Sequence, residues 1–180
     1  MRILKDDAIA VVVDIQELLF PLIHNHEQLE KDTVTLIKGL KVLEVPMLVT
    51  QQYTKRLLPT LPSLAEAIGE YEHLEKMAFS CCDEPKFDEA LAISTKRTVI
   101  LFGIETHVCV LQTCVDLIER GYKPVVVEDC VGSRNPNDKH IAIERMRKEG
   151  AIITTKESLL FELQRVSGTE SFKAISRLVK

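Results

Sequence analysis

Short, continuous runs of valine, isoleucine and leucine recur along the chain, and longer segments with apolar residues every three or four positions separate them. A continuous run is typical of a strand covered on both faces, and the longer spacing is typical of a helix. We therefore expect strands at Ala8–Asp14, Pro46–Thr50, Glu72–Glu75, Thr98–Phe102, Pro124–Val127 and Ala151–Thr154. Helices are expected at Glu27–Leu43, Ser63–Ile68, Phe87–Ile93, Val108–Arg120, Asp138–Lys148 and Lys156–Leu163, with a weaker helical pattern in 169–180.

The order of these segments predicts the fold. Strands that alternate with helices at this spacing form βαβ units, and such units build a parallel sheet. We expect one α/β domain over residues 1–180, doubly wound and Rossmann-like, with a mostly parallel sheet of about six strands flanked by helices. No repeat, low-complexity tract or linker divides the chain.

Composition narrows the function classes. The 180 residues are 46% hydrophobic and 28% charged, which argues against disorder. Lysine and arginine are scattered and the net charge is −4, so we expect no nucleic-acid partner. No apolar run approaches the roughly 20 residues that span a bilayer, so no membrane association is expected. The first strand begins close to Met1, which leaves no room for a leader peptide and predicts a cytoplasmic protein.

Cys109 is the most informative of the five cysteines. The others show no metal-ligand or disulfide spacing, and most are expected to be small buried hydrophobic residues. Cys109 lies where the apolar run Thr98–Phe102 passes through Gly103 into the helix expected from Val108. Unpaired N–H groups and the positive end of a helix dipole favour a thiolate over a thiol there. Cys109 is therefore a candidate nucleophile.

Two further candidates follow other predicted strands. Asp14 ends the first strand, and Lys76 comes directly after Glu72–Glu75. The carboxyl ends of parallel strands meet at one edge of the sheet, and ligands bind beyond that edge. We therefore expect Asp14, Lys76 and Cys109 to lie together, as the acid, amine and thiol of an activated nucleophile. Taken singly, Asp14 could instead end a turn and Lys76 could be a solvated surface residue.

Three motifs in order carry a family resemblance: Val13-Asp14-Ile15-Gln16, Glu75-Lys76-Met77-Ala78-Phe79-Ser80 and Gly103-Ile104-Glu105-Thr106-x-x-Cys109. From about Ala8 to Leu163 the chain resembles the isochorismatase-like cysteine hydrolases. It is most similar to the isochorismatase domain-containing proteins, through Glu44-Val45-Pro46 and Thr50-Gln51-Gln52-Tyr53.

The resemblance implies a catalytic triad of Asp14, Lys76 and Cys109. It also implies a cis peptide bond between Ile104 and Glu105, and an oxyanion hole formed by the backbone N–H groups of Glu105 and Cys109. It further implies a homo-oligomer, for which the apolar tail residues Phe172, Ile175, Leu178 and Val179 could provide a surface, unless they pack on their own chain.

The chain departs from two branches of the family. Metal-dependent nicotinamidases carry Asp-x-His after the second strand, where this chain reads Gln51-Gln52-Tyr53, so we expect no metal and no organic cofactor. Isochorismatases that cleave a vinyl ether lack the cysteine, which is present here. The loop residues Gln51, Gln52 and Tyr53, together with His24, are candidates for substrate binding, although a plain polar loop is an equal alternative. His26 and His107 are expected at the pocket wall or the surface.

These observations predict a metal-independent cysteine hydrolase that cleaves a small amide or a related C–N bond through a thioester intermediate. Its partner would be a small-molecule substrate. Two other interpretations stay open. The protein could be a catalytically silent scaffold or regulatory member of the family, or a redox-sensing thiol protein.

Overall fold

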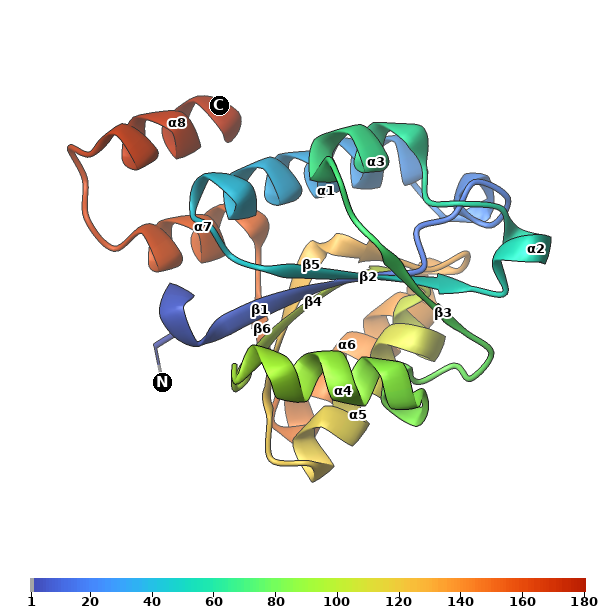
Figure 1. Cartoon of the computed structure of the whole chain (residues 1–180). Helices are drawn as coiled ribbons and strands as arrows, with labels where there is room; N and C mark the ends of the chain where they lie inside the picture. The colour runs from blue at the N-terminus through green and yellow to red at the C-terminus, as the bar shows by residue number, and fades with distance from the viewer. Residues whose placement is uncertain (1) are drawn as a thin grey trace.

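The computed structural model describes residues 2–180. Its centre is one six-stranded sheet in the order β3-β2-β1-β4-β5-β6, and each neighbouring pair is parallel (Figure 1). The strands are β1 Ala8–Val13, β2 Met47–Gln52, β3 His73–Lys76, β4 Thr98–Ile104, β5 Lys123–Gly132 and β6 Ile152–Thr154. The order reverses between β1 and β4, which is the point where doubly wound sheets bind their ligands.

Helices cover both faces of the sheet. On one face lie α1 His26–Val42, α3 Pro62–Ile68, α7 Lys156–Gln164 and α8 Glu170–Leu178 (Figure 1). On the other face lie α4 Pro85–Ser94, α5 Leu111–Glu119 and α6 Pro136–Glu149. The short helices are α2 Thr54–Leu57, η1 Lys5–Asp7, η2 Phe20–Leu22 and η3 Cys81–Asp83, and η4 Thr106–Val110 is a π-helical turn that leads into α5.

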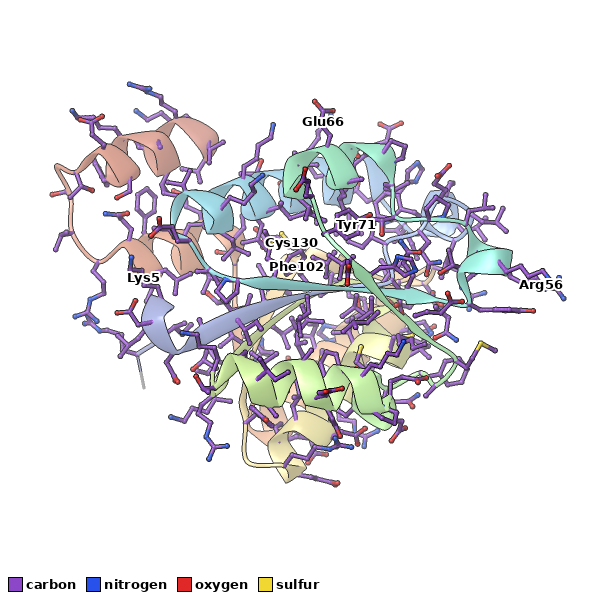
Figure 2. All side chains as sticks on the ribbon, in the orientation of Figure 1. Lys5, Arg56, Glu66, Tyr71, Phe102 and Cys130 are labelled. Carbon is purple, nitrogen blue, oxygen red and sulfur yellow. The ribbon has the colours of Figure 1, made fainter. Side chains whose placement is uncertain are left out.

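The core lies between the sheet and these two helical layers. Every residue of β1 and of β4 is buried, as expected for strands with continuous apolar runs. Figure 2 shows Phe102 and Cys130 in the interior, both fully buried, whereas Lys5, Arg56 and Glu66 project from the surface.

Gly103 is the one position in β4 where a side chain cannot be placed. Its φ is +130°, and a Cβ atom there would lie 2.1 Å from the carbonyl oxygen of Val13. The absence of a Cβ atom therefore allows β1 and β4 to approach closely just before Asp14 and Glu105.

The predicted α/β architecture is confirmed, and the sheet expected to be mostly parallel is wholly parallel. The largest difference is β5, expected at Pro124–Val127 but extending to Gly132. The register with β4 shifts between Leu101 and Gly103, so polar Glu128 and half-buried Asp129 fall inside the strand and interrupt its apolar pattern.

The tail packs on its own chain. Helix α8 contacts α1 and α7, Ile175 is fully buried, and the Phe172 ring lies 6.0 Å from that of Phe161. The tail residues therefore cover this chain's own helices rather than offering a free apolar face. Among residues 2–180, no helix has the length and apolar character needed to cross a bilayer.

Candidate active site

Asp14, Lys76 and Cys109 lie together at the carboxyl edge of the sheet. Asp14 follows β1 with a left-handed backbone (φ 50°), Lys76 ends β3, and Cys109 lies in the π turn after β4. Strand β2 separates β3 from β1, and the long lysine side chain spans that gap. The structure thus brings together the three residues predicted from the ends of three separate strands.

Lys76 is the centre of the cluster. Its Nζ lies 2.7 Å from Asp14 Oδ2 and 3.5 Å from the Cys109 sulfur. The side chains of Lys76 and Asp14 are both 1% exposed, so this ion pair is shielded from water. The second carboxylate oxygen of Asp14, Oδ1, accepts a hydrogen bond of 2.7 Å from the Thr50 hydroxyl.

The surroundings of Lys76 require an ammonium. Besides Asp14, Nζ donates to Gln52 Oε1 at 2.7 Å and to the carbonyl oxygens of Ala78 and Phe79 at 3.0 Å each. With Asp14 these are four acceptor oxygens around an ammonium that has three N–H donors, so every proton of the ammonium has an acceptor. Burial alone would lower the pKa of Lys76, but the nearby Asp14 carboxylate and Cys109 sulfur outweigh it, and the pKa is raised.

The surroundings of Cys109 disfavour its thiolate. Burial raises the pKa of its thiol to about 12, the negative charge of Asp14 adds to the effect, and the Lys76 ammonium opposes it. The expectation of a thiolate at the start of a helix was therefore wrong. The cause is that burial and an adjacent carboxylate outweigh the helix terminus. A thiol beside a carboxylate is arranged to pass its proton to that carboxylate.

The backbone turns sharply between β4 and Cys109. The peptide bond between Ile104 and Glu105 is cis. The Glu105 carbonyl oxygen accepts from the N–H groups of Val108 and Val110 at 3.1 and 3.2 Å. The Glu105 carboxylate accepts from Arg134, through its backbone N–H at 3.2 Å and its Nε at 3.0 Å. Glu105 is thus held at both its backbone and its side chain.

A small cavity of about 130 Å³ opens beside Cys109. Its lining is mostly apolar, with a few polar residues: Asp14, Leu19, Gln52, Leu57, Phe79, Ile104, Glu105, Val108 and Cys109. Larger cavities of about 680 and 760 Å³ lie against α1 and α8, and neither is lined by a cysteine or a histidine. The small cavity is therefore the candidate substrate pocket, because it alone of these three is lined by a cysteine.

Of the residues predicted to bind substrate, only Gln52 lines the small cavity. Gln51 is 2% exposed, and its amide bonds to the hydroxyls of Thr60 and Thr54 at 3.0 and 2.9 Å. Tyr53 is 38% exposed and lies outside the lining of the cavity.

The histidines lie apart from Cys109. His24 borders a different, polar cavity, where its backbone N–H donates to the Ser133 carbonyl oxygen at 3.1 Å. His107 Nδ1 lies 3.0 Å from the Ser133 hydroxyl, and His26 Nδ1 lies 3.3 Å from the carbonyl oxygen of Ile23. Within residues 2–180, no group of three or more histidine, cysteine or acidic side chains could hold a metal ion.

Sequence reasoning missed several parts of the site. Thr50, the acceptor role of Gln52, and the carbonyls of Ala78 and Phe79 were not expected around Asp14 and Lys76. Thr50 has a recoverable signal, because it is a polar residue inside the apolar second strand, which pairs with the strand that Asp14 follows. The carbonyl groups of Ala78 and Phe79 have no such signal in the sequence, since every residue carries a backbone carbonyl group.

The chain is therefore a doubly wound α/β domain that carries a buried acid, amine and thiol at the switch point of its sheet. The isochorismatase domain model matches residues 8–158, and the chain belongs to the isochorismatase family. A secreted isochorismatase effector, Isc1, of Phytophthora sojae is 37% identical over 99% of this chain and 87% of its own length. Mouse isochorismatase domain-containing protein 2A is 36% identical over 99% of this chain and 85% of its own.

Solved structures agree with the fold. The MAR1 ribonuclease of Caenorhabditis elegans is 37% identical, with a TM-score of 0.93 over 99% of this chain and 92% of its own. The YcaC gene product of Escherichia coli, described as an octameric hydrolase of unknown specificity, has a TM-score of 0.92 at 24% identity, over 99% of this chain and 90% of its own.

Proposed function

We propose that this protein is a cysteine hydrolase that cleaves a small amide or a related C–N bond through a thioester intermediate, without a metal or an organic cofactor. The observation that carries the proposal is the buried contact of Lys76 with Asp14 and Cys109, at 2.7 and 3.5 Å, beside a small cavity. A base, a fixed positive charge and a nucleophile are what thiol acylation requires.

In the first half-reaction, the proton of the Cys109 thiol passes to the Asp14 carboxylate as the sulfur attacks the carbonyl carbon. Because burial and the charge of Asp14 raise the pKa of the thiol, the transfer accompanies the attack in this mechanism. The N–H groups of Glu105 and Cys109 donate to the developing oxyanion. Lys76 stays charged, since four oxygens accept from or pair with its ammonium.

The first half-reaction is completed when Asp14 gives its proton to the leaving nitrogen, the C–N bond breaks and the thioester forms. In the second half-reaction, a water molecule attacks the thioester carbon, and Asp14 accepts the proton from that water. The sulfur leaves and recovers the proton, which restores the thiol and releases the acid. Thr50 holds the carboxylate in place throughout, because its hydroxyl donates to Asp14 Oδ1.

The pocket supports a small substrate. A cavity of about 130 Å³ corresponds to only a few water volumes, at about 30 Å³ per water. Its apolar walls from Leu19, Leu57 and Phe79 suit a short aliphatic or planar acyl group. A nucleotide is larger than this space, so the pocket favours a small amide over RNA, the substrate class that the name of the Caenorhabditis elegans relative implies.

The proposal is tested by incubating the protein with a library of small amides and measuring ammonia or amine release. Cys109→Ala should abolish release, whereas Cys114→Ala, a change at a fully buried cysteine in α5 outside the cavity lining, should retain it. Release that survives Cys109→Ala contradicts the mechanism. RNA cleavage with no amide turnover, or a peroxide response alone, would favour the ribonuclease or the redox sensor.

A cytoplasmic location is also proposed. All five cysteines are free thiols in the structure, and such thiols persist in a reducing compartment. The Phytophthora sojae relative is named as secreted, so the compartment of this chain has to be measured. Fractionation of the source cells should place the protein with the cytosol, and recovery from the culture medium would contradict this.

A further inference from the structure

The side chain of Gln52 links Lys76 to the chain that follows it. Its Oε1 accepts a hydrogen bond of 2.7 Å from Lys76 Nζ, which equals the distance from Nζ to Asp14. Its Nε2 donates to the carbonyl oxygen of Met77 at 2.9 Å. Both ends of the amide are therefore engaged by the protein, although Gln52 also lines the substrate cavity.

A second glutamine fixes the backbone of Gln52. The Oε1 atom of Gln16 accepts from the Gln52 N–H at 2.7 Å, and its Nε2 donates to the Gln52 carbonyl at 3.1 Å and to the Leu58 carbonyl at 2.7 Å. Gln16 is fully buried and lies two residues after Asp14. The segment after β1 and the end of β2 are thus tied together on either side of the ion pair.

The chemistry of an amide suits this position. The buried cluster already holds one negative and one positive charge, and a second carboxylate beside Lys76 would compete with Asp14 and leave a net negative charge in a water-poor site. An amide oxygen accepts the hydrogen bond without adding charge. The Asp14 carboxylate attracts the Lys76 ammonium. A second, neutral acceptor limits that displacement and so keeps the ammonium close to the Cys109 sulfur.

We propose that Gln52 is a positioning residue whose neutral amide oxygen holds the Lys76 ammonium between Asp14 and the Cys109 sulfur, with Gln16 holding Gln52 in turn. The proposal rests on the role that the proposed function gives to Lys76. It assigns Gln52 to the ion pair rather than to the substrate.

The test is the pH dependence of Cys109 alkylation by iodoacetamide, from about pH 6 to about pH 10, since only the thiolate reacts. The rate is followed by mass spectrometry of the Cys109 peptide. The variants are Gln52→Met, which removes the acceptor, and Gln52→Glu, which keeps the shape and adds a charge. Gln51→Met is the matched control. It also removes a buried amide with two hydrogen bonds, but that amide does not touch Lys76.

Because burial raises the pKa of the Cys109 thiol to about 12, the whole range lies below the midpoint of alkylation. We expect the alkylation rate across this range to fall in both Gln52 variants and to stay unchanged in Gln51→Met. At a fixed pH below the midpoint, alkylation should slow at least about threefold in Gln52→Met and at least about tenfold in Gln52→Glu, the latter equal to one pKa unit. Thermal unfolding checks that each variant is folded. The near-isosteric Gln52→Glu carries the comparison by itself if Gln52→Met does not fold.

Profiles of both Gln52 variants that coincide with the wild type would overturn the positioning role. This outcome is separate from failure of the proposed function, because alkylation requires no turnover. A shifted profile in a protein that cleaves no amide leaves Gln52 as the positioning residue and removes the amidase. Cys109-dependent amide turnover with unshifted profiles supports the amidase and removes the positioning role of Gln52.

Discussion

At the scale of single residues, the site is organised around a buried lysine. Lys76 contacts the base, the nucleophile and three further oxygens, and Asp14 and Cys109 both depend on its charge. The Lys76 ammonium lowers the pKa of the Cys109 thiol, while burial and Asp14 raise it to about 12. The reactivity of the thiol therefore depends on this one cation.

Lys76→Met should remove that dependence while preserving the length and apolar stem of the side chain. Without the ammonium, the pKa of the Cys109 thiol should rise further, because an uncompensated carboxylate disfavours a second negative charge. Alkylation of Cys109 by iodoacetamide at a fixed pH should slow by at least about tenfold. The control is Lys41→Met, a lysine of α1 that bonds to the Ala67 carbonyl at 3.0 Å, outside the cavity lining. Equal labelling of the folded Lys76→Met protein would contradict the mechanism.

The buried thiols also predict how stability changes with pH. Burial raises the pKa of Cys81, Cys82, Cys109 and Cys114 from 9.0 to about 12. Between these values the unfolded chain loses protons that the folded chain keeps, so the free energy of unfolding falls as pH rises above about 9. Each thiol can contribute up to about 1.4 kcal/mol per pH unit.

Urea unfolding at pH values on both sides of 9 checks this prediction. The midpoint should fall steeply on the alkaline side, and Cys114→Ala should reduce the slope. A slope that is unchanged in Cys114→Ala would show that its thiol does not stay protonated in the folded protein.

At the scale of elements, the close approach of β1 and β4 depends on one glycine. Gly103→Ala should destabilise the protein by more than about 4 kcal/mol, because the added Cβ meets the backbone of Val13 at 2.1 Å and the side chain cannot move away. Gly150→Ala, at φ +111° with nothing within 4 Å of the added Cβ, should cost only about 1–2 kcal/mol. Thermal and urea unfolding of the two variants give the comparison, and equal losses would contradict it.

The arrangement of the strands explains which site residues could be predicted from the sequence and which could not. Asp14, Lys76 and Cys109 were predictable together because each follows a recognisable strand, and parallel topology brings strand ends to one edge. Gln51 and Gln52 were not separable, because adjacent strand residues point to opposite faces and the pattern there is polar at both positions. One is bonded to Thr60 and Thr54, and the other to Lys76.

Features that produce no periodic pattern could not be predicted from the sequence. His24 lies in a loop that folds toward Ser133, far along the sequence, and no local pattern indicates that direction. The pKa of Cys109 was misjudged for a related reason. A helix start can be recognised locally, but burial and the proximity of Asp14 arise only from the assembled fold.

At the scale of the whole molecule, several exposed apolar residues follow the strand ends that carry the site. Leu18, Leu22, Leu58, Met77 and Phe79 are 55, 62, 43, 64 and 55% exposed. All lie in segments that follow the carboxyl ends of β1, β2 or β3, the same edge that carries Asp14 and Lys76. Exposed apolar residues at one edge of a folded chain are typical of a surface that another protein covers.

We expect a second copy of this chain to cover that surface, so the protein should be a homo-oligomer in which the mouth of the site lies at or near the contact. Light scattering at micromolar concentration should give a mass that is a multiple of 20.4 kDa. Met77→Lys combined with Leu18→Lys should shift the mass toward the monomer, because two charges would have to be buried in the contact. Ile93→Lys, at a position in α4 that is 73% exposed and away from this edge, should leave the mass unchanged. A wild-type monomer at this concentration would contradict the assembly. An oligomer that dissociates with Ile93→Lys rather than with the paired change would place the contact on the α4 face.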